Sequence, residues 1–214
     1  MNPNLERGRH TCHLYEWEGE FKAVALGFVG GGLSNGESCI YVADRSAVDD
    51  WYVEFQAYGI DVRSSRDTGA LEVAASDSWR RDVLRGSMAM SRQILELYNN
   101  KTRNSTNLRI GGDFHWESEP VVPADRVCHW EATADFLVEE LQADMICQYD
   151  LNLYTPEFIH SALRTHPVVL YQSRSLLNPF YEAPAILAQE PRLNHSSGDR
   201  DFVAGLLATL ASIT

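Results

Sequence analysis

Hydrophobic positions along the chain change repeatedly between the spacing of strands and the spacing of helices. The run at 37–43 (ESCIYVA) is continuous, apolar and rich in β-branched and aromatic residues, which is typical of a buried strand. Apolar residues at 20–30 and at 46–58 instead have helical spacing. The second of these predicted helices has Ser46 as its cap and Gly59 at its end.

The same alternation continues to the end of the chain. Further strands are predicted at 13–16, 60–62, 71–74, 108–113, 144–149 and 168–171. Further helices are predicted at 78–99, weakened near Gly86, at 124–141, at 155–164 with Thr155 as its cap, and at 199–212 as an amphipathic segment. Strands that alternate with long helices are typical of an α/β fold: three layers, a mainly parallel sheet, and helices on both faces. In such folds the ligand site lies at the carboxyl ends of the strands.

Length, composition and charge limit the domain organisation and the kinds of molecule that the chain is expected to bind. The 214 residues favour one domain, which we expect over 1–188, followed by a tether and a C-terminal amphipathic helix over 189–214. Eighteen basic against 30 acidic residues give a net charge of −12, which repels nucleic-acid phosphates. No apolar run reaches the roughly 20 residues of a membrane span, and the first ten residues lack the apolar stretch of a signal peptide. We therefore expect a cytoplasmic protein that contacts neither membrane nor nucleic acid directly.

The glycine-rich segment 30–36 (GGGLSNG) is the first candidate for chemistry. A phosphate-binding loop requires glycines after a strand and before a helix, whereas these glycines follow a predicted helix and precede a predicted strand. Neither of the two lysines, Lys22 and Lys101, lies beside a glycine-rich turn. We interpret Gly30, Gly31 and Gly32 as the end of the helix, and ATP hydrolysis by a standard phosphate loop is not supported.

The segment His10-Thr11-Cys12-His13 is dense in potential metal ligands. Strand alternation places His10 and Cys12 on one face and His13 on the other. A transition-metal site would need further ligands to converge on them, and the remote candidates are His115, Cys128, His129, Cys147 and His166. No spacing matches a known zinc module, so structural or polar-pocket roles are favoured and we expect no bound metal.

Two predicted strands end in an acidic residue beside aromatic rings. Asp113, His115 and Trp116 follow one strand, and Tyr149 and Asp150 end the next. An ionisable anchor with aromatic walls suits a small-molecule pocket. The alternative is an ordinary loop in which the indole packs against the core and the carboxylate caps the next element, and both interpretations stay open.

Asn178-Pro179-Phe180-Tyr181 follows the last predicted strand. An Asn-Pro pair favours a turn, so this segment is either a pocket lid or a plain turn. The sequence contains no Gly-x-Ser-x-Gly elbow and no His-Glu-x-x-His, and no cysteine has an evident base beside it. An enzyme is therefore not the expected class.

Taken in order, these segments resemble the MEDS family, the methanogen/methylotroph sensory domain. The resemblance spans about residues 10–184. Its matching positions are His10, Cys12, Tyr15, Gly32, Leu33, Gly36, Glu37, Tyr41, Val42, Leu108, Arg109, Gly112, Asp113, Trp116, Glu131, Cys147, Tyr149, Asp150, His166, Asn178 and Tyr181.

The resemblance implies a RecA/KaiC-like α/β domain without a phosphate loop, which senses a small organic molecule of a hydrocarbon-derived class. We expect no catalysis and no cofactor. The ligand-binding candidates are His10, Cys12, Tyr15, Asp113, His115, Trp116, Glu131, Cys147, Tyr149, Asp150, His166, Asn178 and Tyr181. No output domain is visible in 189–214, so the signal is expected to pass to a partner regulatory protein, or between copies of this chain through 199–213. Two rival hypotheses are a degenerate nucleotide-binding protein and a protein-interaction module without a ligand.

Overall fold

A computed structural model describes residues 9–85, 87–103, 105–119 and 121–187. Among these residues, seven strands form one sheet in the order β3-β2-β4-β5-β1-β6-β7. The strands are β1 (His10–Tyr15), β2 (Ser38–Ala43), β3 (Leu71–Ala75), β4 (Leu108–Gly112), β5 (Asp144–Asp150), β6 (Val168–Tyr171) and β7 (Arg174–Leu177). Each neighbouring pair is parallel except β6 and β7. The predicted three-layer α/β fold with a mainly parallel sheet is confirmed.

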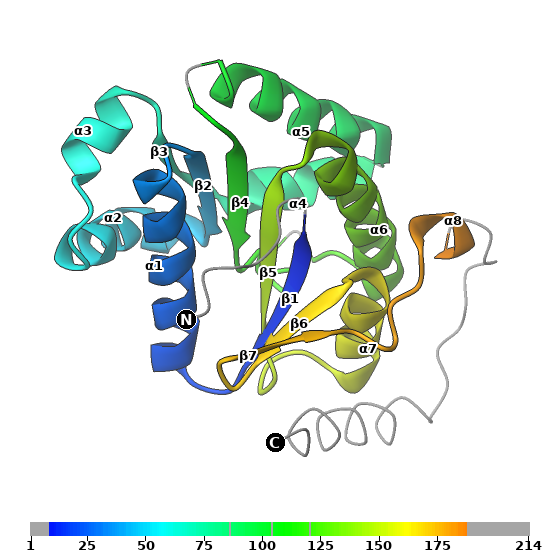
Figure 1. Cartoon of the computed structure of the whole chain (residues 1–214). Helices are drawn as coiled ribbons and strands as arrows, with labels where there is room; N and C mark the ends of the chain where they lie inside the picture. The colour runs from blue at the N-terminus through cyan, green and yellow to red at the C-terminus, as the bar shows by residue number, and fades with distance from the viewer. Residues whose placement is uncertain (1–8, 86, 104, 120, 188–214) are drawn as a thin grey trace.

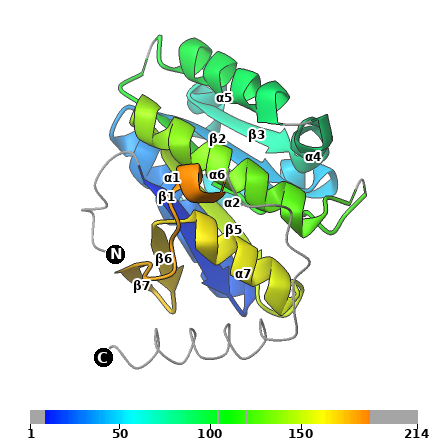
Figure 2. The ribbon, with the colours of Figure 1, turned by 90° about the vertical axis from the view of Figure 1, so that its right-hand side faces the viewer.

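Helices cover both faces of the sheet (Figure 1). One face carries α1 (Glu18–Ser34), α2 (Val48–Ala57), which follows the short helix η1 (Arg45–Ala47), and α3 (Val62–Asp67). The opposite face carries α4 (Ser76–Arg85), α5 (Ser87–Lys101), α6 (Ala124–Leu141) and α7 (Pro156–Thr165), and Figure 2 looks onto this layer. The short helix α8 (Pro184–Leu187) packs against α6.

The sheet separates two hydrophobic cores. The core under α4–α7 contains Trp79, Trp116 and Trp130, and the core under α1 and α2 contains Trp51 and Phe55. Because β1 and β5 are central strands, their alternating side chains enter both cores. Both strands are therefore buried along almost their whole length.

Several predicted elements need correction. The strand predicted at 60–62 is wrong, because Val62 begins α3 and the Asp61 carboxylate caps that helix by accepting a hydrogen bond from the Ser64 amide at 3.0 Å. The single helix predicted at 78–99 is two helices, α4 and α5, on either side of residue 86. Strand β7 was not predicted. The helix expected at 199–212 lies outside the described residues.

Glycines 30–32 lie inside α1 rather than at its end. A Cβ atom on Gly32 would lie 2.6 Å from Cys39 Sγ and 2.7 Å from Arg109 Cδ. Gly32 therefore allows α1 to approach β2 and β4 closely, which is a packing role. Helix α1 ends only after Ser34, and Gly36, with φ +75°, makes the turn into β2.

Candidate functional site

Four potential metal ligands meet in the core under α6 and α7. They are His10 at the start of β1, Glu131 on α6, Cys147 on β5, and His166 between α7 and β6. One side-chain ligand atom from each lies within 4.8 Å of the others. All four residues are completely buried. We call these residues the His10 cluster.

Strand pairing explains how His10 and Cys147 come to share one face. Strands β1 and β5 are parallel neighbours, and Cys12 is the Cα partner of Cys147. Side chains at paired positions of parallel strands point to the same side, and so do side chains two positions apart. His10, Cys12 and Cys147 therefore all face α6, whereas His13 faces α1 and lies 2.9 Å from the Gln148 amide nitrogen.

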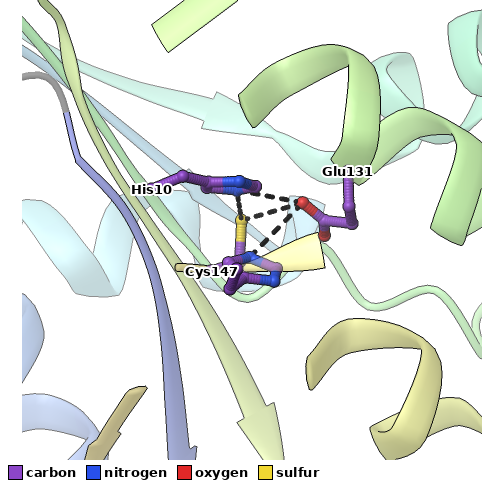
Figure 3. Close-up of side chains that lie close together, drawn as sticks. His10, Glu131 and Cys147 are labelled. Atoms are coloured by element: carbon purple, nitrogen blue, oxygen red, sulfur yellow. Dashed lines mark hydrogen bonds and ion pairs between the residues drawn. The ribbon is translucent and has the colours of Figure 1, made fainter. Parts of the chain in front are cut away.

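Figure 3 shows His10, Glu131 and Cys147 pointing toward one another. Oε2 of Glu131 is the centre of the contacts: it lies 3.1 Å from His10 Nε2, 3.5 Å from Cys147 Sγ and 3.5 Å from His166 Nε2. His10 Nε2 is also 3.4 Å from Cys147 Sγ. The two imidazole rings lie 3.8 Å apart between their centroids.

Further polar groups surround the carboxylate of Glu131 and the ring of His10. The Tyr149 hydroxyl donates a hydrogen bond to Oε1 of Glu131. Asp135, one helical turn after Glu131, places Oδ1 3.7 Å from His10 Nδ1. The Tyr181 hydroxyl donates to the other oxygen of Asp135 at 2.6 Å.

The ring of His166 is held by backbone groups. Its Nδ1 lies 2.6 Å from the Ala162 carbonyl oxygen, which can only accept, so Nδ1 carries the proton. Nε2 is then an unprotonated nitrogen, and although it is buried it has no hydrogen-bond partner in the part of the chain that the structure describes. The Asn178 amide donates to the His166 carbonyl at 2.8 Å, which anchors this junction to the segment after β7.

The pKa values of His10 and His166 are shifted in opposite directions. Burial lowers the pKa of His10, but Asp135 and Glu131 outweigh that effect and raise its pKa from 6.5 to about 9. Burial and the neighbouring His10 charge lower the pKa of His166 well below its ordinary value. Burial, reinforced by Glu131, raises the pKa of the Cys147 thiol well above its ordinary value. The two carboxylates therefore favour the charged form of His10, whereas burial and His10 favour the neutral form of His166.

A separate polar group lies at the carboxyl edge of the sheet. Asp113 accepts hydrogen bonds from the hydroxyls of Tyr15 at 3.0 Å and Tyr154 at 3.3 Å, and from the backbone amide of His115 at 2.9 Å. Burial raises the pKa of Asp113. His115 Nδ1 lies 3.6 Å from Oε1 of Glu117. This group joins the carboxyl ends of β1 and β4, whereas His10 lies at the opposite end of β1.

Trp116 packs into the core. Its ring stacks on Phe114 with centroids 5.1 Å apart and meets the Trp130 ring at 5.1 Å. It is 1% exposed. Of the two interpretations left open by the sequence, the geometry favours the loop whose indole packs down while Asp113 accepts from the following backbone.

The predicted ligand residues thus divide between two places. His10, Cys12, Glu131, Cys147, Tyr149, His166, Asn178 and Tyr181 belong to the His10 cluster or its surroundings, whereas Tyr15, Asp113, His115 and Trp116 belong to the carboxyl edge. Asp150 accepts from the Asn152 amide at 2.8 Å and shapes the turn after β5. Asp135 was not predicted. It lies four residues after Glu131 on one predicted helix, and this spacing indicates that the two side chains share a helix face.

A cavity of about 300 Å³ lies away from both groups, between α1 and the sheet. Val24 and Phe28 from α1 and Leu170 from β6 contribute apolar walls, while Arg109 and Asp144 line it at the amino ends of β4 and β5. None of the predicted ligand residues lines this cavity. The cavity could not be predicted from the sequence, because it depends on how α1 packs on strands that are distant in the sequence.

The junction between β1 and α1 differs from a phosphate loop. Glu16 and Trp17 join the two elements, and Glu18 and Glu20 lie in the first turn of the helix. A phosphate loop presents backbone amides and a lysine at this kind of junction, whereas these carboxylates repel an anion. The geometry therefore does not favour nucleotide binding at the start of α1.

These features define a three-layer α/β domain with a buried polar cluster on one face of its sheet and a small cavity on the other. The family model of the methanogen/methylotroph, DcmR sensory domain (MEDS) matches residues 9–167, so the chain belongs to the MEDS family. That family name points to a sensory role. No curated protein matches the chain. Among the described residues, no helix is both long and apolar enough to cross a membrane.

Proposed function

We propose that this chain is a non-catalytic sensor that binds a small organic molecule in the cavity between α1 and the sheet. The observation that carries the proposal is the cavity itself. A volume of about 300 Å³ is at the lower end of the range for small-molecule sites, and its walls combine apolar side chains with a few charged ones. The family's sensory role supports the same function.

The described lining supports binding rather than catalysis. Its only carboxylate is Asp144, whose Oδ2 lies 3.9 Å from Nε of Arg109. The described lining contains neither an imidazole nor a thiol. A neutral or weakly polar ligand, such as a short alcohol, thioether or halogenated alkane, would bury its apolar part against Phe28 and Leu170.

The bound signal would pass to a partner regulatory protein or to a second copy of this chain. Ligand binding can shift such an equilibrium only if the ligand prefers one of two conformations of the domain. Light scattering and partner capture, with and without ligand, would measure this step separately from binding.

Gly31 offers a sharp test, because a Cβ atom there would meet only Arg109 Nη1, at 3.7 Å. A thermal-shift screen of small organic compounds should identify ligands that raise the melting temperature of the wild-type chain. Gly31→Leu would fill the cavity and should abolish the shift. Gly31→Ala removes the same glycine but adds only one methyl group, so it should keep most of the shift. Compounds that stabilise Gly31→Leu as well as wild type would contradict the proposed site.

A further inference from the structure

We propose that the His10 cluster is a four-ligand site for a zinc ion. The ligands are Nε2 of His10, Oε2 of Glu131, Sγ of Cys147 and Nε2 of His166. This proposal departs from the sequence-based expectation of no metal, and it replaces Cys12 by Cys147 as the sulfur ligand. It does not depend on the small-molecule function proposed above.

Four of the six separations between the ligand atoms are close to those of tetrahedral coordination. Zinc bonds of about 2.0–2.3 Å to nitrogen, oxygen and sulfur place neighbouring ligands of a tetrahedron roughly 3.2–3.7 Å apart. These four separations measure 3.1, 3.4, 3.5 and 3.5 Å. The remaining two separations lie within 4.8 Å. The rings of His10 and His166, whose centroids are 3.8 Å apart, would have to swing apart for both nitrogens to bind one tetrahedral ion.

His166 provides an independent reason to place a cation here. Its Nδ1 proton is committed to the Ala162 carbonyl, so Nε2 presents a lone pair. That lone pair lies 3.5 Å from Oε2 of Glu131, which is also an acceptor, and Nε2 has no hydrogen-bond partner among the described residues. A buried nitrogen lone pair without a donor is unfavourable, and a cation bound at Nε2 would satisfy it.

The surrounding groups are those that orient metal ligands. A histidine ligand commonly directs its second ring nitrogen to a carbonyl or a carboxylate. His166 does so toward Ala162, whereas His10 Nδ1 lies 3.7 Å from Asp135 Oδ1, beyond hydrogen-bond distance, and would have to move closer. Tyr149 holds the oxygen of Glu131 that is turned away from the cluster.

The types of ligand atom and their burial indicate which ion would bind and what role it would have. Two imidazoles, one thiolate and one carboxylate suit Zn²⁺ better than Mg²⁺ or Ca²⁺, which prefer oxygen ligands. Binding would displace protons from His10 Nε2 and Cys147 Sγ, and the two remaining negative charges would balance the ion. Four protein ligands leave no open position, and all are completely buried, so the ion would be structural. It would join β1, α6, β5 and the α7–β6 junction.

Metal analysis of the full chain, purified without a polyhistidine tag, tests the proposal. We expect about one zinc ion per chain, and after its removal Co²⁺ should give a thiolate charge-transfer band and the intense visible bands of tetrahedral coordination. Cys147→Ser should lose the charge-transfer band. Cys12→Ser is the matched control, because Cys12 is an equally buried neighbour on β1 that is not a ligand, and it should keep the band.

If Cys147→Ser does not fold, Co²⁺ titration of the metal-free wild-type chain still tests the proposal. Absence of zinc from the purified chain, together with no tetrahedral Co²⁺ spectrum on titration, would overturn the proposal. Loss of the band in Cys12→Ser and its retention in a folded Cys147→Ser would overturn the assignment of the sulfur ligand. Ligand screening against the cavity is a separate measurement, so either proposal can fail alone.

Discussion

The Tyr149 hydroxyl donates a hydrogen bond to one oxygen of Glu131 and thereby fixes the direction of the other. That second oxygen lies within 3.5 Å of His10, Cys147 and His166. Tyr149 also packs edge-on against the ring of Tyr154, whose hydroxyl donates to Asp113. The buried cluster and the carboxyl edge are therefore connected by two tyrosines in contact.

Replacing this hydroxyl should affect both stability and metal affinity. Tyr149→Phe leaves a buried oxygen of Glu131 without its donor, which should cost about 1–3 kcal/mol of unfolding free energy. Loss of a group that orients a metal ligand typically lowers affinity about 10–100-fold. Urea denaturation and competitive Co²⁺ titration would measure the two effects.

Tyr41→Phe is the matched control for this variant. Tyr41 is equally buried, and its hydroxyl donates to Gln148 at 2.9 Å on the opposite face of the sheet. It should lose stability while keeping its Co²⁺ affinity. Equal losses of affinity in the two variants would show that Tyr149 acts only through general stability.

His13 should make the fold sensitive to acid. Burial lowers its pKa from 6.5 to about 3. Between these pH values the unfolded chain takes up a proton at His13 and the folded chain does not. The folded state therefore loses stability as the pH falls through this window, by up to about 1.4 kcal/mol per pH unit.

Denaturation of wild type and His13→Gln at a series of pH values isolates this contribution, because the other titrating groups are common to both chains. Wild type should show the steeper loss between about pH 6 and pH 4. His129→Gln, at an exposed position, should keep the wild-type slope. Parallel slopes for wild type and His13→Gln would disprove the effect.

The sequence predicted those elements whose local signals are complete. Helix 124–141 and strand 168–171 have the predicted bounds, and Thr155 caps α7 by accepting from the Phe158 amide at 3.3 Å. Strand β7 was missed because its residues are mostly exposed, and its hairpin turn uses Gln172 and Ser173 at positive φ instead of the usual Asn-Gly.

The site could be predicted only in part. Alternation correctly placed His10 and Cys12 on one face, but it could not show that β1 lies between β5 and β6. That order is a long-range property, and it decides that His10 meets Cys147 and His166. The rule that sites lie at the carboxyl ends of strands directed attention to Asp113, whereas the cavity lies at the amino ends of β4 and β5.

Substitution by alanine should change the stability of the fold in opposite directions at Gly31 and Gly32, which are neighbours in α1. Gly32→Ala places a methyl group within 2.7 Å of Cys39 Sγ and Arg109 Cδ, which should destabilise the fold by about 1–3 kcal/mol. Gly31→Ala meets nothing closer than 3.7 Å, so the better helix propensity of alanine should stabilise it by up to about 1 kcal/mol. Urea denaturation of both variants tests this contrast, and similar destabilisation of the two would contradict the packing role of Gly32.

The cavity and the His10 cluster should be energetically coupled, because the same two strands form both. Thr11 and Ile146 are paired neighbours that line the cavity, and the residues beside them, His10 and Cys147, belong to the cluster on the other face. A ligand that shifts β1 against β5 would therefore change the ligand geometry of the metal.

We expect a compound identified by thermal shift to alter the visible bands of the Co²⁺-loaded chain. Linkage then requires the metal to change the affinity of that compound by the same factor as the compound changes metal affinity, typically about 5–150-fold. Gly31→Leu should keep a tetrahedral Co²⁺ spectrum that no longer responds to the compound. If the compound binds metal-free and metal-loaded chains equally and leaves the bands unchanged, the two faces of the sheet act independently and the predicted coupling is wrong.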